Sequence, residues 1–168
     1  MIEWKHYGRL LIRIDAANLE LSVRHLGWQV AYSRLHTFFR DRGQLARAVF
    51  YSVQYDTDSH KGFLTVIKKA GFRLNTKPIK VIQDKQSGEQ RKANFDVEIA
   101  VDAMKWLGEF DSLVLFSGDG DFDYLVRHLR SQRKQVVVCS TRYHISRELL
   151  ASADEYLDLR DLKAEWGR

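Results

Sequence analysis

The sequence contains few residues that cross-link or break a chain. Its 168 residues include one cysteine and one proline, and no apolar run is long enough to span a bilayer. The lone thiol, Cys139, follows a run of valines, so no internal disulfide can form and we expect it to be buried. Residues 1–6 lack the apolar centre of a signal peptide. We therefore expect no membrane association and a reducing, cytoplasmic environment.

Two further patterns are missing, and each argues against a class of chemistry. The histidines have none of the spacings typical of zinc ligands; those considered are His25, His36, His60, His128 and His144. No glycine-rich phosphate loop of the Walker or dinucleotide-binding type follows the first predicted strand. Zinc chemistry and redox chemistry with a nucleotide cofactor are therefore disfavoured.

Positive charge is present in moderate excess and is unevenly distributed. The net charge is +5 and the isoelectric point is near 9.3. Basic residues are frequent in the middle and final third of the chain: Lys68, Lys69, Arg73, Lys77, Lys80, Lys85, Arg91, Lys92, Arg127, Arg130, Arg133, Lys134, Arg142 and Arg147. A basic surround about an acidic centre suits a polyanion held by its backbone. The alternative is that these residues form ordinary solvated helix faces.

The hydrophobic pattern alternates between strands and helices along residues 1–168, which we take as a single domain. Strands are predicted at 10–14, 46–53, 72–76, 112–116, 135–139 and 155–159. Helices are predicted at about 16–25, 33–40, 59–70, 95–107, 122–131 and 146–152. This order predicts an α/β fold, with a Rossmann-like α/β/α arrangement around a mostly parallel sheet of five or six strands. Residues 78–94 break the pattern and predict a hairpin or arm, through which a homo-oligomer could form.

Three acidic residues follow predicted strands. Asp15 ends the first strand, while Asp119 and Asp121 lie in the turn Ser117-Gly118-Asp119-Gly120-Asp121-Phe122. Ligands of open α/β sheets bind at the carboxyl ends of the strands, and close carboxylates repel one another unless they share a proton or a cation. If the strands 10–14 and 112–116 are neighbours, Asp15 and Asp119 face each other. The simpler interpretation of Asp15 is a helix N-cap.

A fourth acid, Asp96, lies at the start of a predicted helix. At 100° per residue it lies on the apolar face, with Ala100, Ala103 and Leu107, whereas Asp102 is expected to face solvent. A carboxylate on a buried face is costly unless it is paired or binds a metal. The alternative is favourable interaction with the helix dipole. Asn94 is expected to cap this helix.

Four separated segments resemble the NYN domain of the PIN-like nucleases, and in particular its bacterial LabA-like branch. These segments are 14–18, 92–102, 117–122 and 145–155, in consistent order over about residues 10–160. The resemblance implies a Rossmann-like, PIN-like domain that binds Mg²⁺ or Mn²⁺ and cleaves RNA. It further implies that the catalytic and metal-binding acids are Asp15, Asp96, Asp119 and Asp121, and that Asn18, Ser117 and Lys92 are the supporting substrate-binding groups.

Oxygen-rich acidic sites suit Mg²⁺, which takes carboxylates, water and substrate phosphate as ligands. Two other functions stay open. The first is a non-catalytic module that binds RNA or a protein through the same site. The second is a metal-dependent phosphatase or phosphotransferase with the aspartate after the first strand as nucleophile. Such enzymes often place a second aspartate two residues later, where this chain has Ala17.

Overall fold

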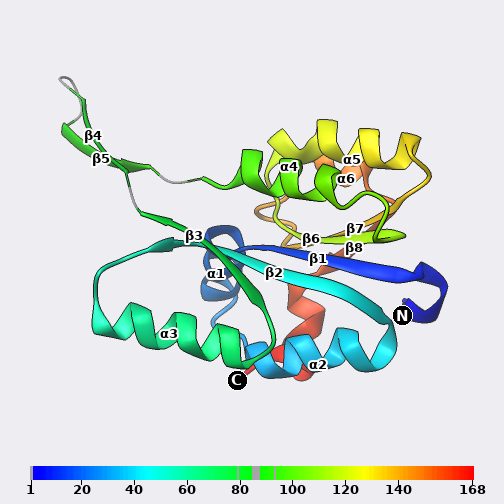
Figure 1. Ribbon diagram of the computed structural model, residues 1–168, viewed down its shortest axis with the longest axis horizontal. Helices are drawn as coiled ribbons and strands as arrows, with labels where there is room; N and C mark the ends of the chain where they lie inside the picture. Colours follow the sequence, from blue (N-terminus) through cyan, green and yellow to red (C-terminus); the bar gives the residue numbers. More distant parts are fainter. Residues whose placement is uncertain (1, 79, 85–87, 93) are drawn as a thin grey trace.

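The computed structural model describes residues 2–78, 80–84, 88–92 and 94–168. Within them, six strands form one parallel sheet in the order β3-β2-β1-β6-β7-β8 (Figure 1). These strands are β1 (Arg9–Asp15), β2 (Gln44–Gln54), β3 (Arg73–Pro78), β6 (Ser112–Phe116), β7 (Gln135–Ser140) and β8 (Glu155–Asp158). The predicted α/β class and parallel sheet are confirmed.

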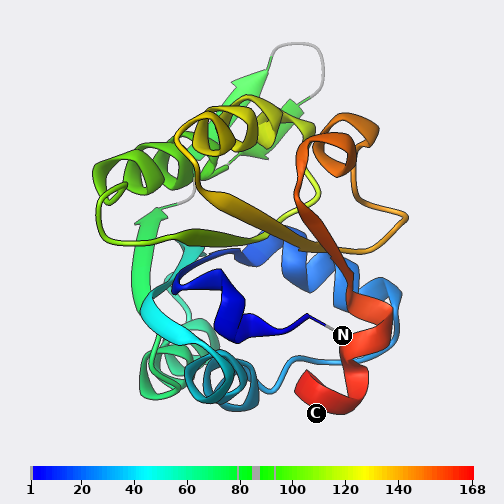
Figure 2. The ribbon, with the colours of Figure 1, turned by 90° about the vertical axis from the view of Figure 1, so that its right-hand side faces the viewer.

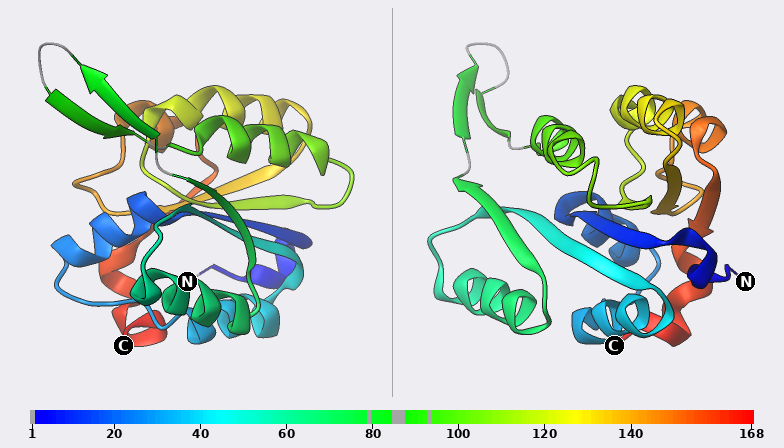
Figure 3. Two further views of the ribbon diagram at one scale, coloured as in Figure 1. Left: turned by 60° about the vertical axis from the view of Figure 1, so that its left-hand side comes forward. Right: turned by 45° about the vertical axis from the view of Figure 1, so that its right-hand side comes forward.

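Helices cover both faces of the sheet and complete three layers (Figures 2 and 3). One face carries α1 (Ala16–His25), α2 (Tyr32–Arg42), α3 (Asp58–Lys69) and α7 (Lys163–Trp166). The other carries α4 (Asp96–Lys105), α5 (Asp123–Ser131) and α6 (Arg147–Ser152). Short 3₁₀ helices are η1 (Trp4–Tyr7), η2 (Gly120–Phe122) and η3 (Leu159–Leu162).

The alternation of side chains along each strand divides the core into two. In β1, Ile12 and Ile14 pack in the core beneath α1 and α2, while Leu11 packs in the core beneath α4 and α5. Because both faces are covered, the central strands β1, β6 and β7 are apolar at most positions rather than at alternate ones. This explains the continuous apolar runs in the sequence.

One charged residue, Arg13, lies inside the core beneath α4 and α5. It is fully buried, and its guanidinium carbon is 4.3 Å from the centre of the Trp106 ring and 5.8 Å from that of Tyr51. Its nitrogen atoms have no hydrogen-bond partner among the described residues. Burial lowers the pKa of Arg13 to about 10, against the opposing effects of Tyr51 and Asp102. Stacking on aromatic rings therefore takes the place of hydrogen bonding here.

The prediction that Asp102 faces solvent is wrong. The Tyr51 hydroxyl donates a 2.8 Å hydrogen bond to Asp102 Oδ2, and Asn75 Nδ2 donates another at 3.3 Å. The helical projection placed Asp102 away from the apolar stripe of α4. It could not show that polar side chains of β2 and β3 would meet this flank of the helix.

A hairpin projects from the body between β3 and α4 (Figure 1). It consists of β4 (Lys80–Asp84) and β5 (Gly88–Lys92), which pair with each other in antiparallel fashion and not with the main sheet. It lies within the segment 78–94 where the sequence predicted a hairpin or arm.

Candidate functional site

The site lies where β1 and β6 end side by side. The parallel register pairs Ile14 with Phe116, so the loops that follow, beginning at Asp15 and Ser117, leave the sheet at the same edge. In an open α/β sheet this edge, beside the first strand, is where ligands bind. The two strands are neighbours, which was the condition on which the sequence placed Asp15 opposite Asp119.

Three of the four predicted acids form a compact group. Asp96, Asp119 and Asp121 each offer a carboxylate oxygen, and these oxygens lie within 4.8 Å of one another. Asp119 and Asp121 come from the β6 loop, whereas Asp96 is the first residue of α4. Among the described residues, this is the group of acidic, histidine or cysteine side chains close enough to hold a metal ion.

Asp15 lies beside this group but is engaged differently. It is only 7% exposed, and its carboxylate accepts hydrogen bonds from the backbone N–H groups of Ala17 (3.1 Å) and Asn18 (3.3 Å). It therefore is the N-cap of α1. Burial raises the pKa of Asp15, the hydrogen bonds oppose this rise, and the nearby charge of Asp119 adds to it.

The pKa of Asp96 is sensitive to the negative charge that is concentrated at the site. Burial, followed by the charges of Asp119, Asp15 and Asp121 in that order, raises the pKa of Asp96 to about 6, while the charge of Lys77 opposes the rise. The group thus carries more negative charge than its surroundings compensate. A bound cation would relieve this repulsion.

Asn18 and Ser117 hold the two loops in place. Asn18 Nδ2 donates to Asp15 Oδ2 (2.8 Å), and its Oδ1 accepts from the Gly118 backbone N–H (3.3 Å). Ser117 Oγ accepts from the Asp119 N–H (3.2 Å). Asn18 thus connects the start of α1 to the β6 loop, and Ser117 fixes the backbone that presents Asp119.

A third loop, at residues 141–146, closes over the β6 loop. The Ser146 N–H donates to the Gly118 carbonyl oxygen at 2.9 Å. A Cβ at position 118 would overlap the His144 carbonyl oxygen and lie 2.7 Å from Ser140 Oγ. Glycine is therefore required here because of close backbone approach, a reason that the sequence did not reveal.

Asn94 does not cap α4, so that prediction is wrong. Phe95 occupies the N-cap position and makes no side-chain capping bond. Instead, Asn94 Nδ2 donates a 2.7 Å hydrogen bond to Asp96 Oδ2. Asn94 therefore orients a carboxylate of the site, and its position two residues before Asp96 was the only signal for this role.

Lys77, at the end of β3, was not predicted as a site residue. Its Nζ is 2.6 Å from Glu98 Oε1 and 4.4 Å from the centre of the Phe95 ring, and its charge lowers the pKa of Asp96. The signal that could have found it was its place at the carboxyl end of a strand in the same sheet. The side chain of Lys92, predicted to support the site, falls outside the described part of the structure.

A hollow of about 600 Å³, the size of a small-molecule site, opens beside Asp15. Asp15 forms part of its wall, together with aromatic side chains from β2 and the start of α4, Tyr51 and Phe95. The site therefore adjoins a concave surface rather than a flat one.

Comparison with known proteins agrees with this architecture. The chain is 33% identical over 161 residues to the low amplitude and bright protein LabA of Synechococcus elongatus, covering 94% of this chain and 87% of LabA. The crystal structure of a protein of unknown function from Vibrio parahaemolyticus superposes with a TM-score of 0.81 at 23% identity, covering 97% of this chain and 98% of the other. In the described residues, no helix is both long and apolar enough to cross a bilayer. The model of the NYN domain matches residues 9–160, and the chain therefore belongs to the NYN domain family.

Proposed function

We propose that this protein is a metal-dependent ribonuclease that hydrolyses phosphodiester bonds at the carboxyl edge of its sheet. The observation that carries the proposal is the meeting of Asp96, Asp119 and Asp121 within 4.8 Å. Membership of a family of predicted PIN-like nucleases supports it.

The donor set fits Mg²⁺ or Mn²⁺. It contains carboxylate oxygens only, with no thiol or imidazole in the group. Mg²⁺ is usually bound by one or two carboxylates, and water and substrate phosphates complete its shell. The raised pKa of Asp96 is consistent with a partly buried group of carboxylates whose repulsion a bound cation would relieve.

When bound, such an ion would activate water and neutralise charge on the phosphate. In the proposed mechanism Asp96, Asp119 and Asp121 hold the ion. Asp15 adds a fourth negative charge beside them, and Asn18 keeps its loop in register with that of Asp119.

Positive charge at the rim suits a nucleic-acid backbone. Lys77 lies close enough to influence Asp96, on the side of the site formed by β3 and the start of α4. A lysine there can contact a phosphate adjacent to the one that is cleaved.

The test is cleavage of a fluorescein-labelled single-stranded RNA by the purified protein with Mg²⁺, Mn²⁺ or EDTA. We expect cleavage with either metal, none with EDTA, and a loss of roughly 100-fold or more in Asp119→Asn, because even indirect disturbance of a metal site costs 10–100-fold. Asp161→Asn, an exposed change in η3, is the matched control and should retain activity.

Two results would contradict the proposal. Cleavage that survives in Asp119→Asn would place the chemistry elsewhere. Binding of RNA without cleavage by the wild type in either metal would instead favour the non-catalytic module.

A further inference from the structure

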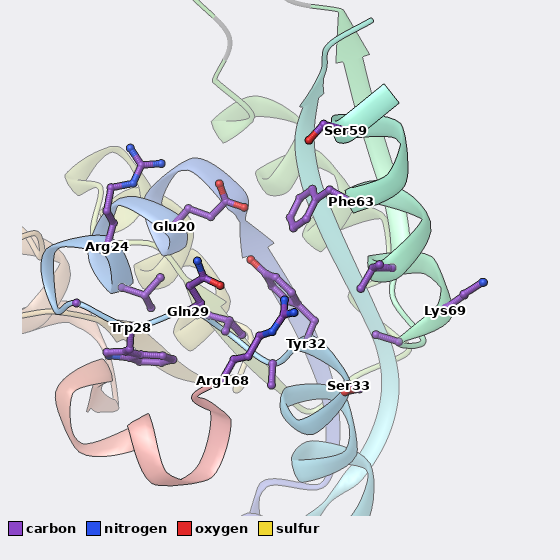
Figure 4. A pocket seen from close by; sticks show the side chains of 16 residues that line it. Glu20, Arg24, Trp28, Gln29, Tyr32, Ser33, Ser59, Phe63, Lys69 and Arg168 are labelled. Atoms are coloured by element: carbon purple, nitrogen blue, oxygen red, sulfur yellow. The ribbon is translucent and has the colours of Figure 1, made fainter. Parts of the chain in front are cut away.

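A second and larger cavity adjoins the candidate site. Its volume is about 1110 Å³, and it lies between α1, α3 and the start of α2 (Figure 4). It shares Glu20, Ser59 and Phe63 with the 600 Å³ hollow that reaches Asp15. The two cavities are therefore neighbours, and a ligand that passes Asp15 in the smaller one can extend into the larger one.

The walls of this cavity are largely apolar and aromatic. Phe63 and Tyr32 lie with ring centres 5.8 Å apart at 72°, and Trp28 forms part of the opposite wall (Figure 4). Trp28 is 6% exposed, and its indole N–H has no hydrogen-bond partner among the described residues. Flat apolar walls with a few polar groups are typical of sites for planar aromatic ligands such as nucleobases.

The charges around the cavity divide into a basic rim and a single acid. Arg24, Lys69 and Arg168 line it and carry the positive charge that phosphate groups require (Figure 4). Glu20 is the acidic residue among the described residues of the lining, and it lies close to Tyr32 and Arg24. An ionised carboxylate accepts hydrogen bonds and donates none, so the half-buried Glu20 selects a ligand with N–H groups.

The distance along α1 from Asp15, which lies beside the acidic group, to Glu20 is short. Asp15 caps α1 and Glu20 follows five residues later, which is about 7.5 Å along the helix axis at 1.5 Å per residue. One nucleotide can span this distance. A phosphate held at the acids would therefore bring a neighbouring base to the cavity.

We propose that this cavity binds an unpaired guanine of a single-stranded RNA whose adjacent phosphodiester lies at the acidic site. The proposal rests on the ribonuclease function proposed above. Guanine is favoured because its ring N–H and amino group are adjacent donors that match the two oxygens of one carboxylate. Adenine and cytosine place a ring acceptor beside the amino group, and uracil places its single N–H between two carbonyls.

The test measures binding by fluorescence anisotropy in EDTA, so that no cleavage is required. The probes are two labelled RNA heptamers, UUUGUUU and UUUUUUU. We expect the wild type to bind the first about tenfold more tightly, since one bidentate contact to a base discriminates by about this factor or more. Glu20→Gln should reduce the difference to less than about twofold, whereas Glu3→Gln, whose carboxylate is 77% exposed beside η1, should preserve it.

Two further probes test the guanine site on the wild-type protein, so their results do not depend on whether Glu20→Gln folds. Inosine in place of guanosine removes the amino group, and we expect several-fold weaker binding to the unchanged protein. Guanosine monophosphate should displace the heptamer only in large excess. Displacement at equal concentration would assign the cavity to a free nucleotide and overturn the assignment to RNA.

The outcomes separate this inference from the ribonuclease proposal. Equal affinity of the wild type for both heptamers, or a preference that survives in a folded Glu20→Gln, overturns the guanine site even if the protein cleaves RNA. A guanine preference that Glu20→Gln removes supports the site even if no cleavage is found with Mg²⁺ or Mn²⁺.

Discussion

Replacing Asp96 by asparagine should make the metal-free protein more stable at neutral pH. The pKa of Asp96 is about 6 in the folded chain against an ordinary value of 3.8, because burial and three neighbouring carboxylates disfavour its charge. Below about pH 4 the side chain is protonated in both the folded and unfolded states, so it does not lower the free energy of unfolding. As the pH rises from about 4 to 6 the unfolded state loses its proton first, so folding stability falls across this window. Above pH 6 the whole penalty is present, and Asp96→Asn removes it.

The size of the penalty follows from the shift. A change of roughly two pKa units corresponds to about 3 kcal/mol at 1.36 kcal/mol per unit. Because Asp96 is partly exposed, solvent screens the repulsion and we expect about 1–2 kcal/mol. For a chain of this size that is a rise of about 2–8 °C in Tm.

The assay is thermal unfolding in EDTA at pH 8 and pH 4, followed by circular dichroism. Asp58→Asn is the matched control, because Asp58 and Asp96 are each the first residue of a helix and both substitutions remove a charge from a helix N-terminus. Relative to this control, Asp96→Asn should melt higher at pH 8 and at the same temperature at pH 4.

Added Mn²⁺ should make the wild type more stable than Asp96→Asn. At 100 times its dissociation constant an ion stabilises the state that binds it by about 2.7 kcal/mol. The wild type should gain this increment, and Asp96→Asn should gain little. An unchanged Tm of Asp96→Asn at pH 8, or an equal Mn²⁺ shift in both proteins, would refute the reasoning about the acidic group.

Three further substitutions test the surroundings of the site. Gly118→Ala adds a methyl group against the His144 carbonyl, so it should lower stability by about 1–3 kcal/mol in urea titration, and an unchanged midpoint would refute the close packing. Asn18→Ala removes the hydrogen bonds that link Asp15 to Gly118, and calorimetry should show roughly tenfold weaker Mn²⁺ binding. Equal affinity would show that this link does not contribute to metal binding. Arg13→Met should leave the free energy of unfolding unchanged or raise it by up to about 3 kcal/mol, because an apolar chain replaces a buried charge that has no hydrogen-bond partner among the described residues. A clear loss of stability would contradict this.

The local sequence determined the order of the elements and one half of the site. Apolar runs such as 112–116 specify buried strands, and their alternation with helices requires parallel crossovers. Once β1 and β6 are parallel neighbours, their register brings Asp15 and Asp119 to one edge. Asp119 and Asp121 lie two residues apart in one turn. A few consecutive backbone angles therefore determine how close their side chains are.

The tertiary structure alone decided the other half. Asp96 reaches the β6 loop because α4 begins at that edge after the hairpin, and no local pattern encodes where a crossover helix begins in space. The same holds for Glu20, whose cavity is lined by residues of α1, α2 and α3 that are distant in the sequence. Periodicity fixes which side of a helix is apolar, but side-chain packing between elements distant in sequence fixes what that side meets.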